Sequence, residues 1–127
     1  MKRWLALLLL AALAWLVPSD MHAQKVDEYR YFSNRMARII DQLHLTSDQE
    51  AKVKPIIEQE VGLLEGVHGN PVLSRKEKLK KYWAIVRKAN SSIKPILTTE
   101  QLTAFDSMQA DQKEKYDKWM EEAKKAG

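Results

Sequence analysis

Residues 45–68 have the sequence LTSDQEAKVKPIIEQEVGLLEGVH, and this stretch decides the fold class. Valine, isoleucine and leucine recur in it three and four positions apart, which is the spacing of one face of an α-helix. Thr46 followed by Gln49 forms a capping box, in which each side chain satisfies a backbone N–H at the helix start. The stretch therefore predicts an amphipathic helix over residues 47–68.

Other residues of this stretch predict its bend, its end and its polar face. Pro55 lacks a backbone N–H and crowds the preceding turn, so we expect it to kink the helix. Gly69 is expected just beyond the C-terminus, at the position that favours a left-handed backbone. Four acidic residues are expected on the solvated face: Glu50, Glu58, Glu60 and Glu65.

Three further segments show the same helical spacing, and no segment shows the alternation that is typical of a β-strand. They cover about residues 25–43, 75–94 and 99–125. The last two begin at further capping boxes, at Ser74 and at Thr98. The chain is therefore predicted to be all-α, with four helices in long hairpins.

Two arrangements fit four helices of this length. They can form a closed up-down bundle, or an open arrangement of long hairpins that completes its core by dimerising. A small chain without disulfides builds only a small core of its own, and such cores often depend on oligomerisation, so the residues alone leave both arrangements open. Trp119 and Met120 are expected either in the core or across the dimer seam.

The first 23 residues are predicted to be a secretory signal peptide. Lys2 and Arg3 precede 14 consecutive apolar residues at positions 4–17, and Pro18 follows them. This run is shorter than the roughly 20 residues of a membrane span, so we expect cleavage after Ala23; an uncleaved anchor is the alternative.

The mature chain, residues 24–127, is predicted to be a single exported domain without a stable membrane anchor. It contains no cysteine, which excludes disulfides, a thiolate nucleophile and a cysteine zinc site. It carries 19 Lys and Arg against 16 Asp and Glu residues. Export argues against a nucleic-acid partner despite this basic balance.

The capping box at Thr46 belongs to a motif that occurs twice. Leu-Thr-x-x-Gln is formed by Leu45, Thr46 and Gln49 and, 52 residues later, by Leu97, Thr98 and Gln101. Two copies in an exported, cysteine-free helical chain resemble the Spy/CpxP-like family of periplasmic LTxxQ-motif proteins from Gram-negative bacteria. The resemblance covers about residues 36–115. We expect the motif to act mainly through capping, with a direct role in binding as the alternative.

The resemblance implies a periplasmic location and a four-helix protomer that dimerises into a curved cradle, so we expect an open, cradle-like antiparallel homodimer and keep the closed bundle as the alternative. The family includes an ATP-independent chaperone, an envelope-stress accessory that restrains a sensor kinase, and relatives that bind metals. For this chain the resemblance therefore implies binding of unfolded or aggregation-prone envelope proteins. Restraint of the periplasmic domain of a sensor kinase is the alternative, and metal sensing comes after it.

The third predicted helix has the strongest charge bias. Residues 74–94 hold eight Lys and Arg side chains against one acidic side chain. At about 100° per residue, one stripe carries the candidate client-binding residues Lys76, Lys80, Trp83, Arg87 and Lys94. Basic stems beside an indole attract acidic groups and contact apolar ones, so this stripe is a candidate surface for client recognition. An ordinary solvated helix face, with Trp83 in the core or the dimer seam, is the interpretation that the residues alone favour. Three arginines would extend this surface: Arg30, Arg35 and Arg38.

The side chains that build common catalytic and metal sites are sparse. The mature chain has two histidines, and only Asp48, four residues after His44, could help either of them to hold a metal. No nucleophile-elbow, zinc-protease or P-loop pattern occurs. We therefore predict no enzymatic activity, no metal site and no cofactor.

Overall fold

The computed structural model describes residues 28–126, so the predicted signal peptide and its cleavage site lie outside the described residues. The elements, in chain order, are α2 (Glu28–Ser33), α3 (Met36–Leu43), α4 (Ser47–His68), α5 (Arg75–Ile93), the 3-10 helix η1 (Lys94–Ile96) and α6 (Thr99–Ala126). Every element within this part of the chain is helical, which confirms the all-α prediction.

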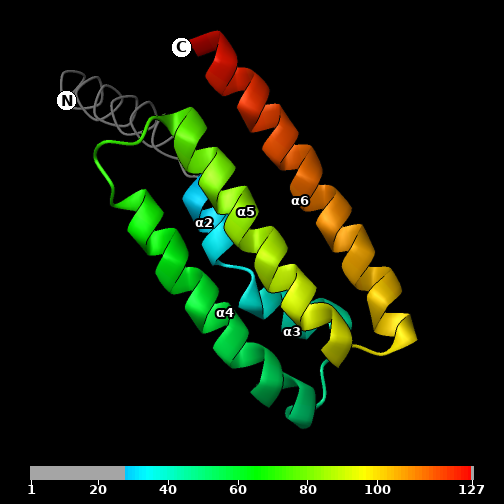
Figure 1. The fold of residues 1–127 in the computed structure, drawn as a ribbon. Helices are drawn as coiled ribbons and strands as arrows, with labels where there is room; N and C mark the ends of the chain where they lie inside the picture. The colour runs from blue at the N-terminus through cyan, green and yellow to red at the C-terminus, as the bar shows by residue number, and fades with distance from the viewer. Residues whose placement is uncertain (1–27, 127) are drawn as a thin grey trace, which may run out of the picture.

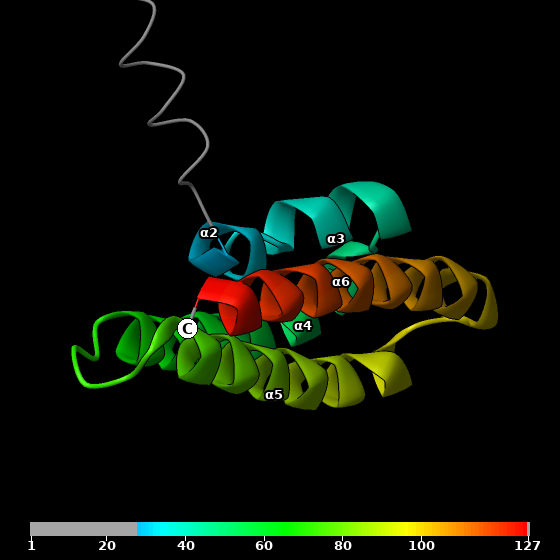
Figure 2. The ribbon, with the colours of Figure 1, turned by 90° about the horizontal axis from the view of Figure 1, so that it is seen from above.

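The three long helices α4, α5 and α6 lie side by side and run in alternating directions (Figure 1). The two short helices follow one another along one side of them (Figure 2). There α2 contacts α4 and α5, and α3 contacts α4 and α6. We call residues 28–43 the arm, because this segment packs across all three long helices.

The first predicted helix is interrupted, so the prediction of one helix over residues 25–43 is wrong. Asn34 and Arg35 separate α2 from α3. The guanidinium of Arg38 donates a hydrogen bond to the carbonyl oxygen of Tyr31, which satisfies a backbone group near the end of α2. The interruption places the Arg35 side chain in the interior, where it is 0% exposed.

The other helices begin where the sequence predicts and end close to it. Helix α4 has the predicted bounds and continues through Pro55. Gly69 has a right-handed backbone (φ −79°), so the prediction of a left-handed residue there is wrong; its N–H donates to the Glu65 carbonyl at 2.9 Å. Helix α5 ends at Ile93 and η1 continues it through Pro95.

Both predicted LTxxQ capping boxes are present. The Thr46 hydroxyl accepts from the Gln49 N–H at 3.2 Å, and Gln49 Oε1 accepts from the Thr46 N–H at 3.0 Å. Thr98 and Gln101 repeat both bonds at 3.3 and 3.0 Å. At Ser74 only the first bond forms, because Glu77 there accepts from the Ser74 hydroxyl instead of the backbone.

The two motif glutamines also bind each other. Gln49 Nε2 donates to Gln101 Oε1 at 2.7 Å, and Gln101 Nε2 donates to Gln49 Oε1 at 3.0 Å. Gln49 Nε2 also donates to the backbone carbonyl of Ile96, just before the second motif, and Gln101 Nε2 donates to that of Leu43, just before the first motif. Both donors and both acceptor positions of each amide are therefore used. The pair joins the starts of α4 and α6 to each other.

The core consists of two apolar clusters. The arm-start cluster comprises Phe32, Leu64, Leu79, Tyr82, Val86, Met120 and Ala123. The cap-end cluster comprises Ile39, Leu43, Val53, Ile57, Ile93, Leu97 and Phe105. Four buried polar residues lie along the chain between members of the two clusters, one from the arm and one from each long helix: Arg35, Glu60, Asn90 and Gln112. We call these four residues the polar layer. Met120 thus lies in the core, as does the partly buried Trp119 beside it.

Candidate functional site

A groove of about 670 Å³ runs between α5 and α6, along the stripe that the sequence singles out. Its α5 wall includes Trp83, Arg87, Lys88 and Lys94, and its α6 wall includes Asp106 and Lys113. Small residues of both helices line it, among them Ala84, Ser91 and Ala110. It brings together three of the five predicted client-binding residues.

The other two predicted residues lie apart from the groove. Lys76 and Lys80 are exposed on the first half of α5 and do not line it. The structure therefore divides the predicted stripe into a groove portion and an open portion nearer the start of the helix. Both portions are basic.

Trp83 is partly buried at one end of the groove. Its ring stacks on that of Tyr116, with centroids 5.3 Å apart and 14° between the planes. It also packs against the arm-start cluster. The indole is therefore held by the core, and it closes the groove with an apolar wall.

The groove has more positive than negative charge. Four of its lining residues are Lys or Arg and one is acidic. Lys94 Nζ lies 3.8 Å from Asp106 Oδ1, and Lys113 Nζ lies 2.9 Å from Asp117 Oδ2. Arg87 and Lys88 are exposed and take part in none of the ion pairs of residues 28–126. Their charges are therefore available to an acidic ligand.

The arm does not extend the basic surface in the way that its sequence predicts. Arg30 is exposed. Arg38 lies over the ring of Tyr31, 4.5 Å from the centroid. Arg35 is completely buried, so its assignment to the surface is wrong.

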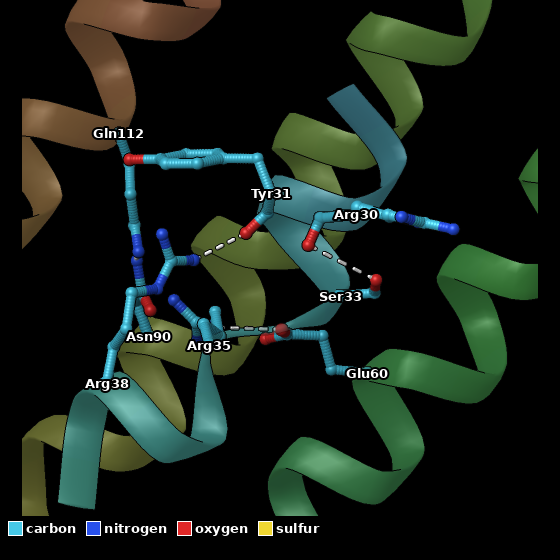
Figure 3. A network of polar contacts seen from close by, with 8 residues as sticks. All are labelled: Arg30, Tyr31, Ser33, Arg35, Arg38, Glu60, Asn90 and Gln112. Carbon is cyan, nitrogen blue, oxygen red and sulfur yellow. Dashed lines mark hydrogen bonds and ion pairs between the residues drawn. The ribbon is translucent and has the colours of Figure 1, made fainter. Parts of the chain in front are cut away.

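Arg35 instead forms an ion pair inside the protein (Figure 3). Its Nε donates to Glu60 Oε1 at 2.7 Å, and neither side chain is exposed. In the same polar layer Asn90 Nδ2 donates to Gln112 Oε1 at 3.4 Å. Several buried atoms of the layer have no hydrogen-bond partner: both Nη atoms of Arg35, Oε2 of Glu60 and Oδ1 of Asn90.

The placement of Glu60 corrects the prediction of a solvated acidic residue. Burial raises the pKa of Glu60 to about 7, against the opposing attraction of Arg35. Burial likewise lowers the pKa of Arg35. A signal for the burial of Glu60 was present, because Val53, Ile57, Glu60 and Leu64 follow a single helical stripe.

The two histidines of the described residues lie apart. His68 stacks on Tyr29 at 4.1 Å between centroids, and its Nδ1 lies 3.4 Å from the Tyr82 hydroxyl. His44 is exposed and closes α3 with a left-handed backbone, φ 52°. Residues 28–126 contain no group of three or more His, Asp or Glu side chains placed to hold a metal ion.

None of the helices in the described part of the chain is both long and apolar enough to span a membrane.

Comparisons with known proteins assign no family to this chain. No family model, curated protein or solved structure matches the chain.

Proposed function

We propose that this protein is an exported, ATP-independent chaperone-like protein that holds unfolded or aggregation-prone envelope proteins. The observation that carries the proposal is the α5–α6 groove, where cations outnumber acids four to one beside a core-anchored Trp83. Such a surface suits chains that expose acidic and apolar groups together. The site that binds them needs no nucleotide, metal or cofactor.

Binding is proposed to take place in two stages. The exposed cations of α5 accelerate the encounter, because charge attraction acts over about 10 Å at moderate ionic strength. Trp83 and the aliphatic stems of the lysines then contact apolar groups of the client. Each contact is weak, so the client can leave and fold.

The LTxxQ motifs support this role through architecture. Their glutamine pair joins the starts of α4 and α6, and this connection fixes the end of the hairpin that forms the groove. We therefore propose that the six motif residues hold the scaffold and that α5 supplies the binding surface.

The test is suppression of aggregation of an unrelated unfolding protein at stoichiometric ratios, without ATP. We expect the purified protein to reduce light scattering. Neutralising three α5 cations together (K80Q/R87Q/K94Q) is expected to weaken suppression several-fold, and more so at low salt, where their charges are less screened.

A matched triple variant provides the control. Lys52, Lys54 and Lys124 are exposed on α4 and α6, so K52Q/K54Q/K124Q changes the net charge equally away from the groove. We expect it to retain suppression. Absence of suppression by the unaltered protein over a range of substrates would reject the proposal. The alternative, restraint of a sensor kinase, then predicts raised basal stress signalling in a deletion strain.

We further propose that the mature protein acts in the periplasm as an open antiparallel homodimer. The N-terminal signal-like segment supports the compartment. Two apolar side chains support the dimer: Leu63 on α4 is 50% exposed and Val72 is 85% exposed. Gly62 and Gly66, beside Leu63, leave open space on the same helix.

A further inference from the structure

We infer that the α5–α6 groove takes an extended acidic segment of about five residues with an apolar or aromatic side chain at its Trp83 end. The inference rests on the proposed function, because it names the part of a client that this site binds. Four properties of the groove lead to it: length, volume, charge and the position of the indole.

The length of the groove sets the number of residues. The lining positions of α5 extend from Trp83 to Lys94. At 1.5 Å per residue, these 11 steps span about 16 Å. An extended chain rises about 3.3 Å per residue, so about five residues cover the span.

The volume favours an extended ligand over a helix of the same length, because more than half of a helix would lie above the groove. A helix with side chains is about 10–12 Å wide, so 16 Å of it occupies about 1,500 Å³. The groove provides about 670 Å³. An extended strand is narrower than a helix, and unfolded chains present such strands.

The distribution of charge specifies acidic side chains in the middle of the segment. Arg87 and Lys88 lie between the two ends of the α5 wall and form no ion pair within residues 28–126. Lys94, at the far end, already lies 3.8 Å from Asp106. Central acids of the ligand would therefore meet the two cations without internal competition.

The same groove is less suited to a nucleic acid. Asp106 on the α6 wall would face the phosphates of a polynucleotide. One face of the Trp83 ring is stacked on Tyr116, so that face cannot stack on a nucleic-acid base. An apolar side chain of a peptide can instead pack against the remaining exposed part of the indole.

The test is fluorescence anisotropy of a labelled peptide that contains the sequence FDEDE, titrated with the purified protein. Two probes serve as controls: the same peptide with lysine in place of the acids, and the oligonucleotide dT6. We expect the acidic peptide to bind at least tenfold more tightly than either control. Its affinity should fall at least threefold between 50 and 200 mM salt.

A pair of variants on the same helix locates the site. R87E/K88E reverses two groove charges, and K80E/K81E reverses two exposed charges outside the groove. We expect at least a tenfold loss of peptide affinity for the first variant and less than a threefold loss for the second. Unchanged circular dichroism verifies that both variants fold.

The outcomes separate this inference from the proposed function. Equal losses in the two variants, or binding of dT6 as tight as that of the peptide, would overturn the groove assignment. Suppression of aggregation without peptide binding would overturn the inference and leave the chaperone proposal standing. Groove-dependent peptide binding without any suppression would support the inference and reject the chaperone proposal.

Discussion

At the scale of single residues, the least expected feature is the Arg35–Glu60 ion pair in the interior. Removing two charges from water costs several kcal/mol per ion, and one 2.7 Å hydrogen bond offsets only part of that cost. The unpartnered Nη and Oε2 atoms add to it. The pair therefore contributes little net stability, but it leaves few alternative positions for the arm.

The position of Glu60 predicts a pH dependence of stability. Its pKa rises from 4.5 to about 7 on burial, so the folded protein binds a proton that the unfolded chain releases between these values. The contribution of Glu60 to the free energy of unfolding is therefore largest at low pH and is lost as the pH rises through 7. Between pH 5 and pH 8 we expect a loss of about 2–3 kcal/mol from this residue, measured by urea unfolding.

Two variants separate this effect from the titration of other groups. E60Q cannot titrate, so its unfolding free energy should lack this part of the decline. E58Q removes an exposed acid two positions away and should keep the decline of the unaltered protein. Parallel pH profiles of E60Q and the unaltered protein would contradict the assignment.

At the scale of elements, the helix starts follow from the sequence with little help from tertiary packing. Capping needs only residues three positions apart, so Thr46 and Thr98 specify local structure by themselves. The bonds between Gln49 and Gln101 are different, because they join residues 52 positions apart. They depend on the packing that brings α4 and α6 together.

We predict that the glutamine pair is energetically coupled. Q49A and Q101A each remove the bonds of one glutamine to the other amide, to a backbone carbonyl and to the backbone N–H of its own cap threonine, so each should lower the free energy of unfolding by about 1–2 kcal/mol. The double variant should cost less than the sum of the two by about 1 kcal/mol. Urea unfolding of the four proteins of this cycle measures the coupling.

Exposed glutamines provide the reference for that cycle. Gln42 on α3 and Gln59 on α4 are exposed, and their replacement by alanine should change stability by no more than about 0.5 kcal/mol. Additive effects of Q49A and Q101A would show that the two caps act independently and that the cross-bonds are unimportant.

At the scale of the whole molecule, the arm completes both apolar clusters. It supplies Phe32 to one cluster and Ile39 and Leu43 to the other. Helices of six and eight residues are too short to be stable alone in water, so their folding depends on this packing. The long helices still leave Leu63 half-exposed on α4.

The proposed dimer makes a measurable prediction at this scale. Light scattering should give twice the monomer mass, and L63K should shift the mass toward that of the monomer because it places a charge in the seam. T103K adds the same charge at an exposed position of α6 and should leave the mass unchanged. A monomeric mass for the unaltered protein would reject the open dimer.

The candidate site could be predicted only in part. The basic stripe of α5 is visible in the sequence because its residues lie on one helix with a known period. The sequence did not show that only part of this stripe lines a groove, because the α6 wall with Asp106 and Lys113 comes from a different part of the chain. Lys76 and Lys80 fall outside the groove for this reason.

The sequence by itself determined the helical class and where α4, α5 and α6 begin, because periodicity and capping act over a few neighbouring residues. Only the tertiary structure decided the interruption of the first helix at Arg35, the burial of Glu60 and the hydrogen bonds between Gln49 and Gln101. The physical reason is distance along the chain. A buried charge is tolerated only where a partner arrives, and the partner of Arg35 lies 25 residues away in a helix whose position depends on the complete core.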